Sequence, residues 1–450
     1  MKRRNAPHIT TIAFHALLLA LLFTGMAVER AEMAEVAGPI VGSDTSTIRN
    51  PELYGKPNQS RLWYNSYQKR WDAIVPKPGE DGFSDHYLLL DVTGAQTFTP
   101  VLLEDRDDAR PDAFWDDANK TLYVLGSHPT RTEFWRLSYD PVADSYTIQV
   151  GAPGAGVAVP GLTQPGGYLG GNSPAALYVS PNGHVWASVM KTGGLLVQHS
   201  TDGGATWLST PVNLNSGAHV GLTVWTEFQQ GGVTYLGLFA AENGEYNLST
   251  NFYFWTIPQD ADPTALANWT DESSAIPAPV SGERSDDHVS SARDGDGNMY
   301  FAVKTENGSP TSPRLRLFKR TPKGAWSAFT VTTAQEVPEH SRPSLVVDDE
   351  RRTLTVYLNE AEVVGDSVRR AGRKGPVSLD SLADLASTPV VPIFDLANKV
   401  FTDVITPRFP VNSETGVVVL VHNRTDAQVW YAQESYHFYY LPLIVKSAGG

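Results

Sequence analysis

The sequence predicts an all-β fold in which four-stranded antiparallel blades repeat around an axis, a β-propeller. Glycine and proline, with 38 and 31 copies among 450 residues, punctuate the chain too often for long helices. Short alternating apolar segments lie between these turn residues, as in half-buried strands. The same strand–turn–strand pattern also returns about every 45–65 residues, and a long, regular period of this kind indicates radial or linear repetition.

The first 27 residues have the pattern of a secretory signal peptide. Residues 2–4 are basic, residues 12–23 are almost entirely apolar, and Gly-Met-Ala at 25–27 places small residues before a cleavage site. An apolar run of about 12 residues is shorter than the roughly 20 that a spanning helix needs. We therefore expect a secreted protein without a membrane span.

The rest of the chain divides into a leader, one large domain and a tail. Residues 28–58 lack periodicity and are expected to form a leader or linker, residues 59–441 the propeller, and residues 442–450 a C-terminal tail. Little helix is expected, and the best candidate for a short helix is 378–386. Seven blades are predicted, or six because the first copy is degenerate, with starts near residues 61, 110, 172, 219, 286, 341 and 406. In the last copy the first strand is expected at 409–411.

Composition excludes several classes of function. The chain has 35 Lys and Arg against 49 Asp and Glu, and its formal net charge of −14 opposes binding to nucleic acid or to an anionic membrane. The absence of cysteine excludes disulfides, thiolate metal sites and a cysteine nucleophile. Residues 294–298 begin like a calcium loop, but Met299 and Thr305 stand where Gly and Glu are needed. We therefore expect a hairpin there and no cofactor, with calcium left open.

One segment carries a motif of known shape. Residues 200–207, Ser-Thr-Asp-Gly-Gly-Ala-Thr-Trp, match S-x-D-x-G-x-T-W in full, and the glycines and the aspartate suit a tight hairpin. The segment resembles the Asp-box, or BNR repeat, of the sialidase-like propellers. In that family the Asp-box is a structural turn away from the catalytic face. The resemblance therefore implies structural roles for Ser200, Asp202, Gly204, Thr206 and Trp207.

Polar residues gather just before the first strand of each predicted blade. Because rotation about the channel relates the blades, these residues should converge on one mouth of that channel. The candidate catalytic residues are Asp112, Asp286, Asp287 and His288, and the candidate substrate-binding residues are Arg110, Asn172, His219, Arg342 and Arg408. Since guanidinium groups bind carboxylates bidentately, three arginines suggest an acidic ligand such as a sialic acid, a uronic acid or a sulfated sugar. The alternative is a set of blade-linking turns with each arginine paired to a nearby aspartate.

Three functions remain open. The resemblance implies a sialidase-type exo-glycosidase with an arginine triad, here Arg110, Arg342 and Arg408, and a tyrosine nucleophile backed by a glutamate. The family's Arg-Ile-Pro motif is present only as Arg-Pro-Asp or Arg-Pro-Ser, and no tyrosine–glutamate pair is evident. The second function is a uronate polysaccharide lyase, with His288 or His219 as the base and arginines neutralising the carboxylate. The third is a non-catalytic propeller that binds glycan or protein. The leading expectation is a secreted propeller that binds or processes acidic glycans.

Overall fold

The computed structural model describes residues 33–46, 56–79, 84–106, 109–163, 174–244, 252–278, 283–306, 309–336, 339–361, 369–396 and 398–436. The helical elements in these ranges are three short 3₁₀ turns, Leu266–Asn268 (η2), Ser273–Ala275 (η3) and Leu382–Ala386 (η4). The all-β prediction is therefore confirmed. No helix within the described ranges has the length and apolarity to cross a membrane. The expected signal peptide and C-terminal tail lie outside these ranges.

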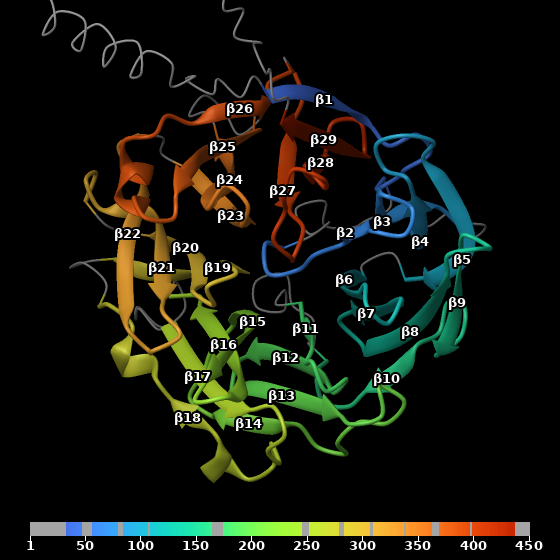
Figure 1. Cartoon of the computed structure of the whole chain (residues 1–450), viewed down its shortest axis with the longest axis horizontal. Coiled ribbons are helices and arrows are strands. Elements are labelled where there is room, and N and C mark those ends of the chain that lie inside the picture. The colour runs from blue at the N-terminus through green and yellow to red at the C-terminus, as the bar shows by residue number, and fades with distance from the viewer. Residues whose placement is uncertain are drawn as a thin grey trace, which may run out of the picture.

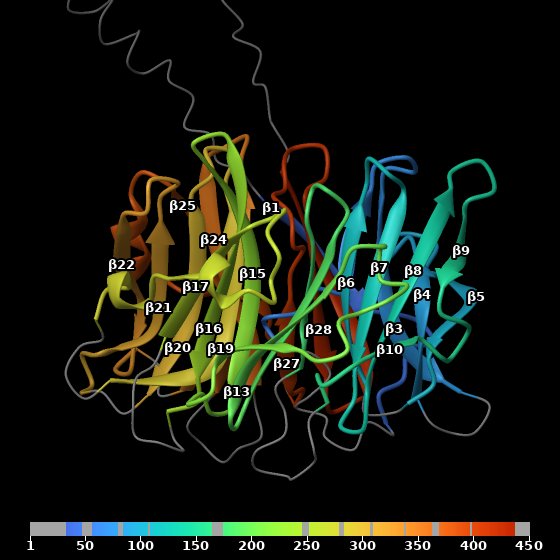
Figure 2. The ribbon, with the colours of Figure 1, turned by 90° about the horizontal axis from the view of Figure 1, so that it is seen from below.

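The strands form antiparallel sheets that stand in a ring around a common axis (Figure 1). Seen from the side, the sheets stand upright next to one another, and loops gather on two opposite faces (Figure 2). In each group of strands the first lies nearest the centre of the ring, and later strands lie closer to the rim (Figure 1). Residues of inner strands therefore meet at the centre although they are far apart in the sequence.

Consecutive strands pair in groups of four, and each group occupies one sector of the ring. The first two groups are β2 (Leu62–Asn65), β3 (Arg70–Pro78), β4 (Ser84–Leu90) and β5 (Thr97–Glu104), then β6 (Arg110–Asp116), β7 (Thr121–Ser127), β8 (Thr132–Asp140) and β9 (Ser145–Val150), with β10 (Val157–Val159) added to β8. The third and fourth are β11 (Ala176–Val179), β12 (Val185–Lys191), β13 (Gly194–Ser200) and β14 (Val212–Asn215), then β15 (Gly221–Gln230), β16 (Val233–Glu242), β17 (Phe252–Pro258) and β18 (Thr270–Asp271). These two groups share one eight-stranded sheet, in which the pair Met190–Gly221 joins β12 to β15.

The remaining groups complete the ring. They are β19 (Arg284–Arg293), β20 (Met299–Glu306), β21 (Pro313–Arg320) and β22 (Trp326–Thr333), then β23 (Glu339–Asp348), β24 (Thr353–Ala361), β25 (Arg369–Ser378) and β26 (Val391–Phe394), and last β27 (Phe401–Ile405), β28 (Val417–Asn423) and β29 (Gln428–Tyr436) with β1 (Met33–Pro39). Because β1 pairs with β29, a strand from the start of the described chain completes the sheet formed by its end. The segment 28–58, expected as a leader or linker, thus contributes a strand to the ring.

The last inner strand differs from the expectation. Phe401–Ile405 forms β27, whereas 409–411, the expected first strand, holds only an isolated bridge between Val411 and Asp348. All five residues of β27 are buried, although Thr402 and Asp403 are polar. As a result Arg408 follows the inner strand of its group, whereas the sequence placed it before that strand.

The hydrophobic core lies between neighbouring sheets. Phe239 of β16 stacks on Phe301 of β20 with ring centroids 4.5 Å apart, and Trp326 of β22 lies beside both rings. Phe239 and Phe301 are fully buried, and burying a side chain of this size stabilises the fold by about 1.5–3 kcal/mol. Aromatic contacts between sheets thus hold the ring together without disulfides.

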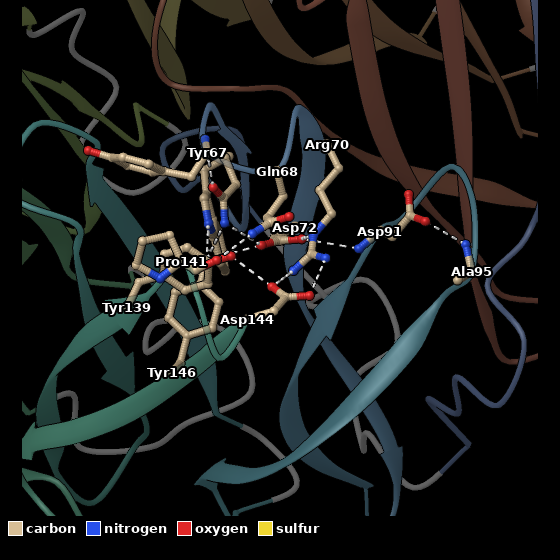
Figure 3. Close-up of polar contacts among 12 residues, drawn as sticks. Tyr67, Gln68, Arg70, Asp72, Asp91, Ala95, Tyr139, Pro141, Asp144 and Tyr146 are labelled. Carbon is tan, nitrogen blue, oxygen red and sulfur yellow. Dashed lines mark hydrogen bonds and ion pairs between the residues drawn. The ribbon is translucent and has the colours of Figure 1, made fainter.

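A polar network joins β3 of the first group to the β8–β9 hairpin of the second (Figure 3). Arg70 of β3 donates two hydrogen bonds to the Asp144 carboxylate, at 2.7 and 2.6 Å, and a third to Asp72 at 2.8 Å. The hydroxyl groups of Tyr139 and Tyr146 donate to Asp144 and Asp72, respectively. Burial acts to lower the pKa of Arg70, but its bonds to Asp144 and Asp72 raise it by more. The guanidinium is therefore the charged centre of this contact.

Replacing Arg70 with methionine is expected to lower the free energy of unfolding by about 2 kcal/mol, because hydrogen bonds to charged groups are worth roughly 1.5–3 kcal/mol. Urea unfolding measures the change. Lys69→Met is the matched control, since Lys69 and its partner Glu414 are largely exposed and 3.1 Å apart. An exposed pair contributes only about 0–1 kcal/mol. Equal losses in the two variants would contradict the role of the network.

Candidate active site

Three neighbouring inner strands break their pairing close to their starts. The register of β19 shifts between Ser285 and Val289, that of β23 between Ser341 and Ser344, and that of β27 between Thr402 and Ile405. Irregularities of this kind re-aim side chains and are frequent next to active sites. The residues inside them include four of the predicted site residues, Asp286, Asp287, His288 and Arg342.

Arg342 and Asp403 face each other from β23 and β27. Both are non-glycine residues with left-handed backbones, φ +52° and +58°, a conformation that costs on the order of 1–3 kcal/mol each. Arg342 Nε lies 2.9 Å from Asp403 Oδ1, and the two side chains are 7% and 0% exposed. Burial raises the pKa of Asp403, while the positive charges of Arg342 and Lys56 act to lower it. Strained backbone and a buried ion pair thus coincide at this point of the ring.

His288 and Asp286 form a buried pair on β19. His288 Nδ1 makes a short hydrogen bond with Asp286 Oδ1, and both side chains are less than a tenth exposed. The other oxygen of Asp286 accepts a hydrogen bond from Lys304 Nζ of β20 at 2.7 Å. A carboxylate on Nδ1 favours the tautomer in which Nδ1 carries the proton and Nε2 keeps its lone pair. That lone pair is what a general base requires.

A charged group close to His288 Nε2 comes from outside the repeats. Residues Lys56–Arg61, here called the inner segment, precede β2 and lie at the centre of the ring (Figure 1). Lys56 Nζ lies 3.5 Å from His288 Nε2, and Asn58 donates to the carbonyl oxygen of Thr223 on β15. Gln59 donates to the carbonyl oxygen of Arg110 on β6. The inner segment is buried throughout and brings a cation to the histidine.

Together these residues can move a proton beside fixed positive charge. His288 offers an imidazole nitrogen, Asp286 orients the ring, and Lys56 lies against the same nitrogen. Arg342 is linked to this group through Asp403, whose carboxylate senses both Lys56 and His288. A base next to cations suits removal of a proton from a carbon next to a carboxylate, because the cations stabilise the charge that develops.

Asp112 and Arg408, predicted site residues, form a different buried pair. Asp112 is fully buried, and its oxygens accept hydrogen bonds from the backbone N–H groups of Ser60 and Leu177 at 2.8 and 2.7 Å. The Arg408 guanidinium also donates to Asp112 and, at 3.0 Å, to the carbonyl oxygen of Leu177. These contacts indicate that Asp112 has a structural role at the centre of the ring. Arg342 and Arg408 pair with different internal carboxylates, so these contacts do not bring the two arginines together as the predicted triad requires.

The other predicted site residues are dispersed. Arg110 is buried at the start of β6. His219 is partly buried before β15, and its backbone N–H donates to Glu242 at 2.7 Å. Asn172 and the side chain of Asp287 lie outside the described part of the structure. Of the predicted set, the contacts therefore join Asp286 to His288 and Asp112 to Arg408, and Arg342 is connected to the first pair through Asp403.

The segment that resembles an Asp-box forms the turn between β13 and β14. Asp202 accepts hydrogen bonds from the backbone N–H and the hydroxyl of Thr206 at 2.9 and 2.6 Å, and from the hydroxyl of Ser200. These bonds outweigh its slight burial and lower the pKa of Asp202 to about 2. Gly204 has φ +91°, and an added Cβ would lie 1.8 Å from the Phe134 ring, on which Trp207 packs. The carboxylate is thus used within the turn.

The loop that begins like a calcium site is a hairpin between β19 and β20. Asp294 accepts hydrogen bonds from Asn298 and from the Tyr300 hydroxyl, and Asp296 pairs with Arg352 at 2.7 Å. These carboxylates bond to partners within the protein, in keeping with the expected hairpin. No cluster of three or more histidine or acidic residues suited to a metal occurs in the described ranges.

Sequence reasoning missed Lys56, Lys304 and Asp403. Lys56 lies in the expected leader, and Lys304 occupies an ordinary position in a strand. Asp403 had a signal, since an aspartate stands within a short segment that also contains Phe401, Val404 and Ile405. The placement of the last inner strand at 409–411 hid this signal.

Comparisons with known proteins show likeness in fold. No protein-family model matches the sequence, and no curated protein matches it either. A solved polysaccharide lyase, described as an ulvan lyase of the new family PL25, has a TM-score of 0.50 and 11% identity over 88% of this chain and 95% of that one. A second structure of this description, bound to -[GlcA(1-4)Rha3S]-, gives the same values. The polysaccharide lyase Uly1 reaches a TM-score of 0.45 at 10% identity, over 85% of this chain and 90% of that one. This chain is thus similar in fold to the PL25 ulvan lyase.

Proposed function

We propose that this chain is an exported, seven-bladed β-propeller. The count takes the eight-stranded sheet as two blades, because a single residue pair joins its two groups of four strands. Each of the seven groups then has four principal strands, in keeping with the blades of known propellers. The pattern of residues 1–27 supports export, and the hydrogen bonds of Asp202 support an Asp-box turn at 200–207.

We propose further that the protein is a polysaccharide lyase that cleaves glycans containing uronic acid. The observation that carries the proposal is the buried His288–Asp286 pair, with Lys56 Nζ 3.5 Å from His288 Nε2. Arg342 adds a second cation from the neighbouring inner strand β23. The structures of similar fold include polysaccharide lyases, one of them with a bound uronate-containing oligosaccharide.

The chemistry follows from the acidity of the substrate. The proton on C5 of a uronate lies next to the carboxylate, and removing it places a second negative charge on that group. His288 Nε2 takes this proton, a double bond forms between C4 and C5, and the bond from C4 to the leaving oxygen breaks. The imidazolium then returns a proton to that oxygen. Lys56 and Arg342 stabilise the charged intermediate, and fixed charges of this kind typically contribute several kcal/mol.

Local charge also determines where such a substrate binds. The chain carries a formal net charge of −14, which repels an acidic polymer at long range. Lys56 and Arg342 provide positive charge at the centre of the ring, where the inner segment and β23 lie. We therefore expect binding of the polymer to weaken when either of these two cations is removed.

The test is depolymerisation of uronate polymers followed by absorbance at about 235 nm, where the unsaturated product of proton abstraction absorbs. Polygalacturonate, polyglucuronate, alginate and ulvan are compared. His288→Gln is expected to lower kcat/KM at least about 100-fold, the usual range for loss of a general base. Its urea midpoint should stay close to that of the parent protein.

His219→Gln is the matched control, because His219 was the other candidate base and lies before a different inner strand. It should retain most of the activity. Absence of an absorbance change on all four polymers would overturn the proposal, and so would full activity of His288→Gln. Release of the dye from a fluorogenic sialoside without a 235 nm product would favour the sialidase-type hydrolase instead.

A further inference from the structure

Charged side chains of alternating sign lead away from the His288–Asp286 pair. Lys304 Nζ lies 2.7 Å from Asp286 Oδ2 and 2.8 Å from Glu306 Oε1. Beyond it, Arg314 of β21 lies 3.7 Å from the same oxygen of Glu306. One buried ammonium group thus bridges two carboxylates, the first of which holds the histidine.

These charged side chains are largely buried, and their charges therefore interact strongly. The side chain of Lys304 is 12% exposed, that of Asp286 5% and that of Glu306 15%. Burial acts to lower the pKa of Lys304, but Asp286 and Glu306 raise it by more, so the ammonium stays charged. With Oδ2 bound to Lys304, Asp286 presents Oδ1 to Nδ1 of His288.

We propose that Lys304 is a positioning residue that acts through Asp286 to orient His288 and to limit its affinity for a proton. The inference rests on the proposed function of His288 as a base, which must stay neutral at the working pH. An aspartate whose charge is shared with a lysine attracts the proton of an imidazolium less than an isolated aspartate does. Lys304 therefore keeps the base available.

Other charges face the histidine and remain in place when Lys304 is changed. Lys56 of the inner segment lies against Nε2 of His288. The carboxylate of Asp403 on β27 interacts electrostatically with His288 and is paired with Arg342 of β23. Removing the positive charge of Lys304 makes the electrostatic environment of His288 more negative. The histidine–aspartate pair should then bind a proton at higher pH.

The test is an NMR titration of the full chain with ¹³C-labelled histidine, in which the signal that disappears in His288→Gln identifies His288. Lys304→Gln is expected to raise the titration midpoint of this signal by about one pH unit or more, the size of effect that one nearby charge typically has. Lys304→Arg, which keeps the charge, should titrate close to the parent protein. Lys399→Gln removes a lysine that precedes β27 and pairs with Asp426 in the turn between β28 and β29, and it should leave the midpoint unchanged.

The acidic limb of the pH profile of kcat/KM on the uronate polymer should move by the same amount in Lys304→Gln. An unchanged midpoint in Lys304→Gln, or an equal shift in Lys304→Arg, would overturn the inference. Because the titration needs no substrate, it tests the role of Lys304 even if no polymer is cleaved. A shifted midpoint without any lyase activity would contradict only the proposed reaction.

Discussion

Replacing Asp112 with alanine is expected to lower the free energy of unfolding by about 3–5 kcal/mol, the cost of removing one partner from a buried ion pair. The change leaves the Arg408 guanidinium, 15% exposed, without its carboxylate. It also removes the acceptor for the backbone N–H groups of Ser60 and Leu177. Urea unfolding at pH 7 measures the loss.

Two further variants separate this role from catalysis. Asp296→Ala removes an aspartate from an exposed pair with Arg352 and should cost no more than about 1 kcal/mol. The double variant Asp112→Ala, Arg408→Met should recover part of the loss, because it no longer leaves a buried charge unpaired. An Asp112→Ala protein with parental stability but no lyase activity would contradict the structural role and restore the catalytic one.

Replacing His86 with leucine is expected to make the protein more resistant to acid. His86 is fully buried in β4, and neither of its ring nitrogens has a hydrogen-bond partner among the described residues. Burial lowers the pKa of His86 well below 6.5, and the charges of Arg61 and Arg106 lower it further. The unfolded chain therefore takes up a proton below about pH 6.5 that the folded protein refuses, so stability is lost as the pH falls.

The expected size follows from the same relation. As the pH falls below 6.5, the parent loses up to about 1.4 kcal/mol of stability per pH unit through His86 until the folded protein also takes up the proton, and His86→Leu does not have this loss. Urea unfolding between pH 4.5 and 7.5 measures the difference between the two proteins. Burial raises the pKa of the neighbouring Glu104 to about 7, and this group titrates in both proteins and cancels in the difference.

His128→Leu is the matched control for this experiment. His128 is partly exposed and lies in the loop between β7 and β8, so its replacement should keep the pH dependence of the parent. Parallel curves for the parent and His86→Leu would show that His86 is protonated in the folded protein. They would contradict the effect of burial and of the two arginines.

The sequence located most strands because their signal is local. Alternation of apolar residues between turns depends on the nearest neighbours along the chain, and it placed the inner strands of six groups within a few residues of their observed starts. It failed at β27, where a buried aspartate breaks the alternation, and at β1, whose partner strand lies nearly 400 residues away. Pairing over such a distance leaves no periodic signal in either segment.

The candidate site was predictable only in part, for a related physical reason. Equivalent positions in the repeats pointed to Asp286, His288 and Arg342, since rotation about the axis brings the starts of inner strands together. The same reasoning from equivalent positions also pointed to Asp112 and Arg408, which form an ion pair with each other in the structure. Whether a buried aspartate holds a histidine or an arginine depends on which strands are neighbours in space.

The sequence by itself therefore determined the all-β class, the repeated strand pattern and the polar residues near the starts of the inner strands. Only the tertiary structure decided which of these residues act together. Lys56 reaches His288 from a segment 232 residues earlier, and Arg342 meets Asp403 across two strands with irregular pairing. Charge interactions in a buried site depend on distances of a few ångströms, and folding alone sets these distances.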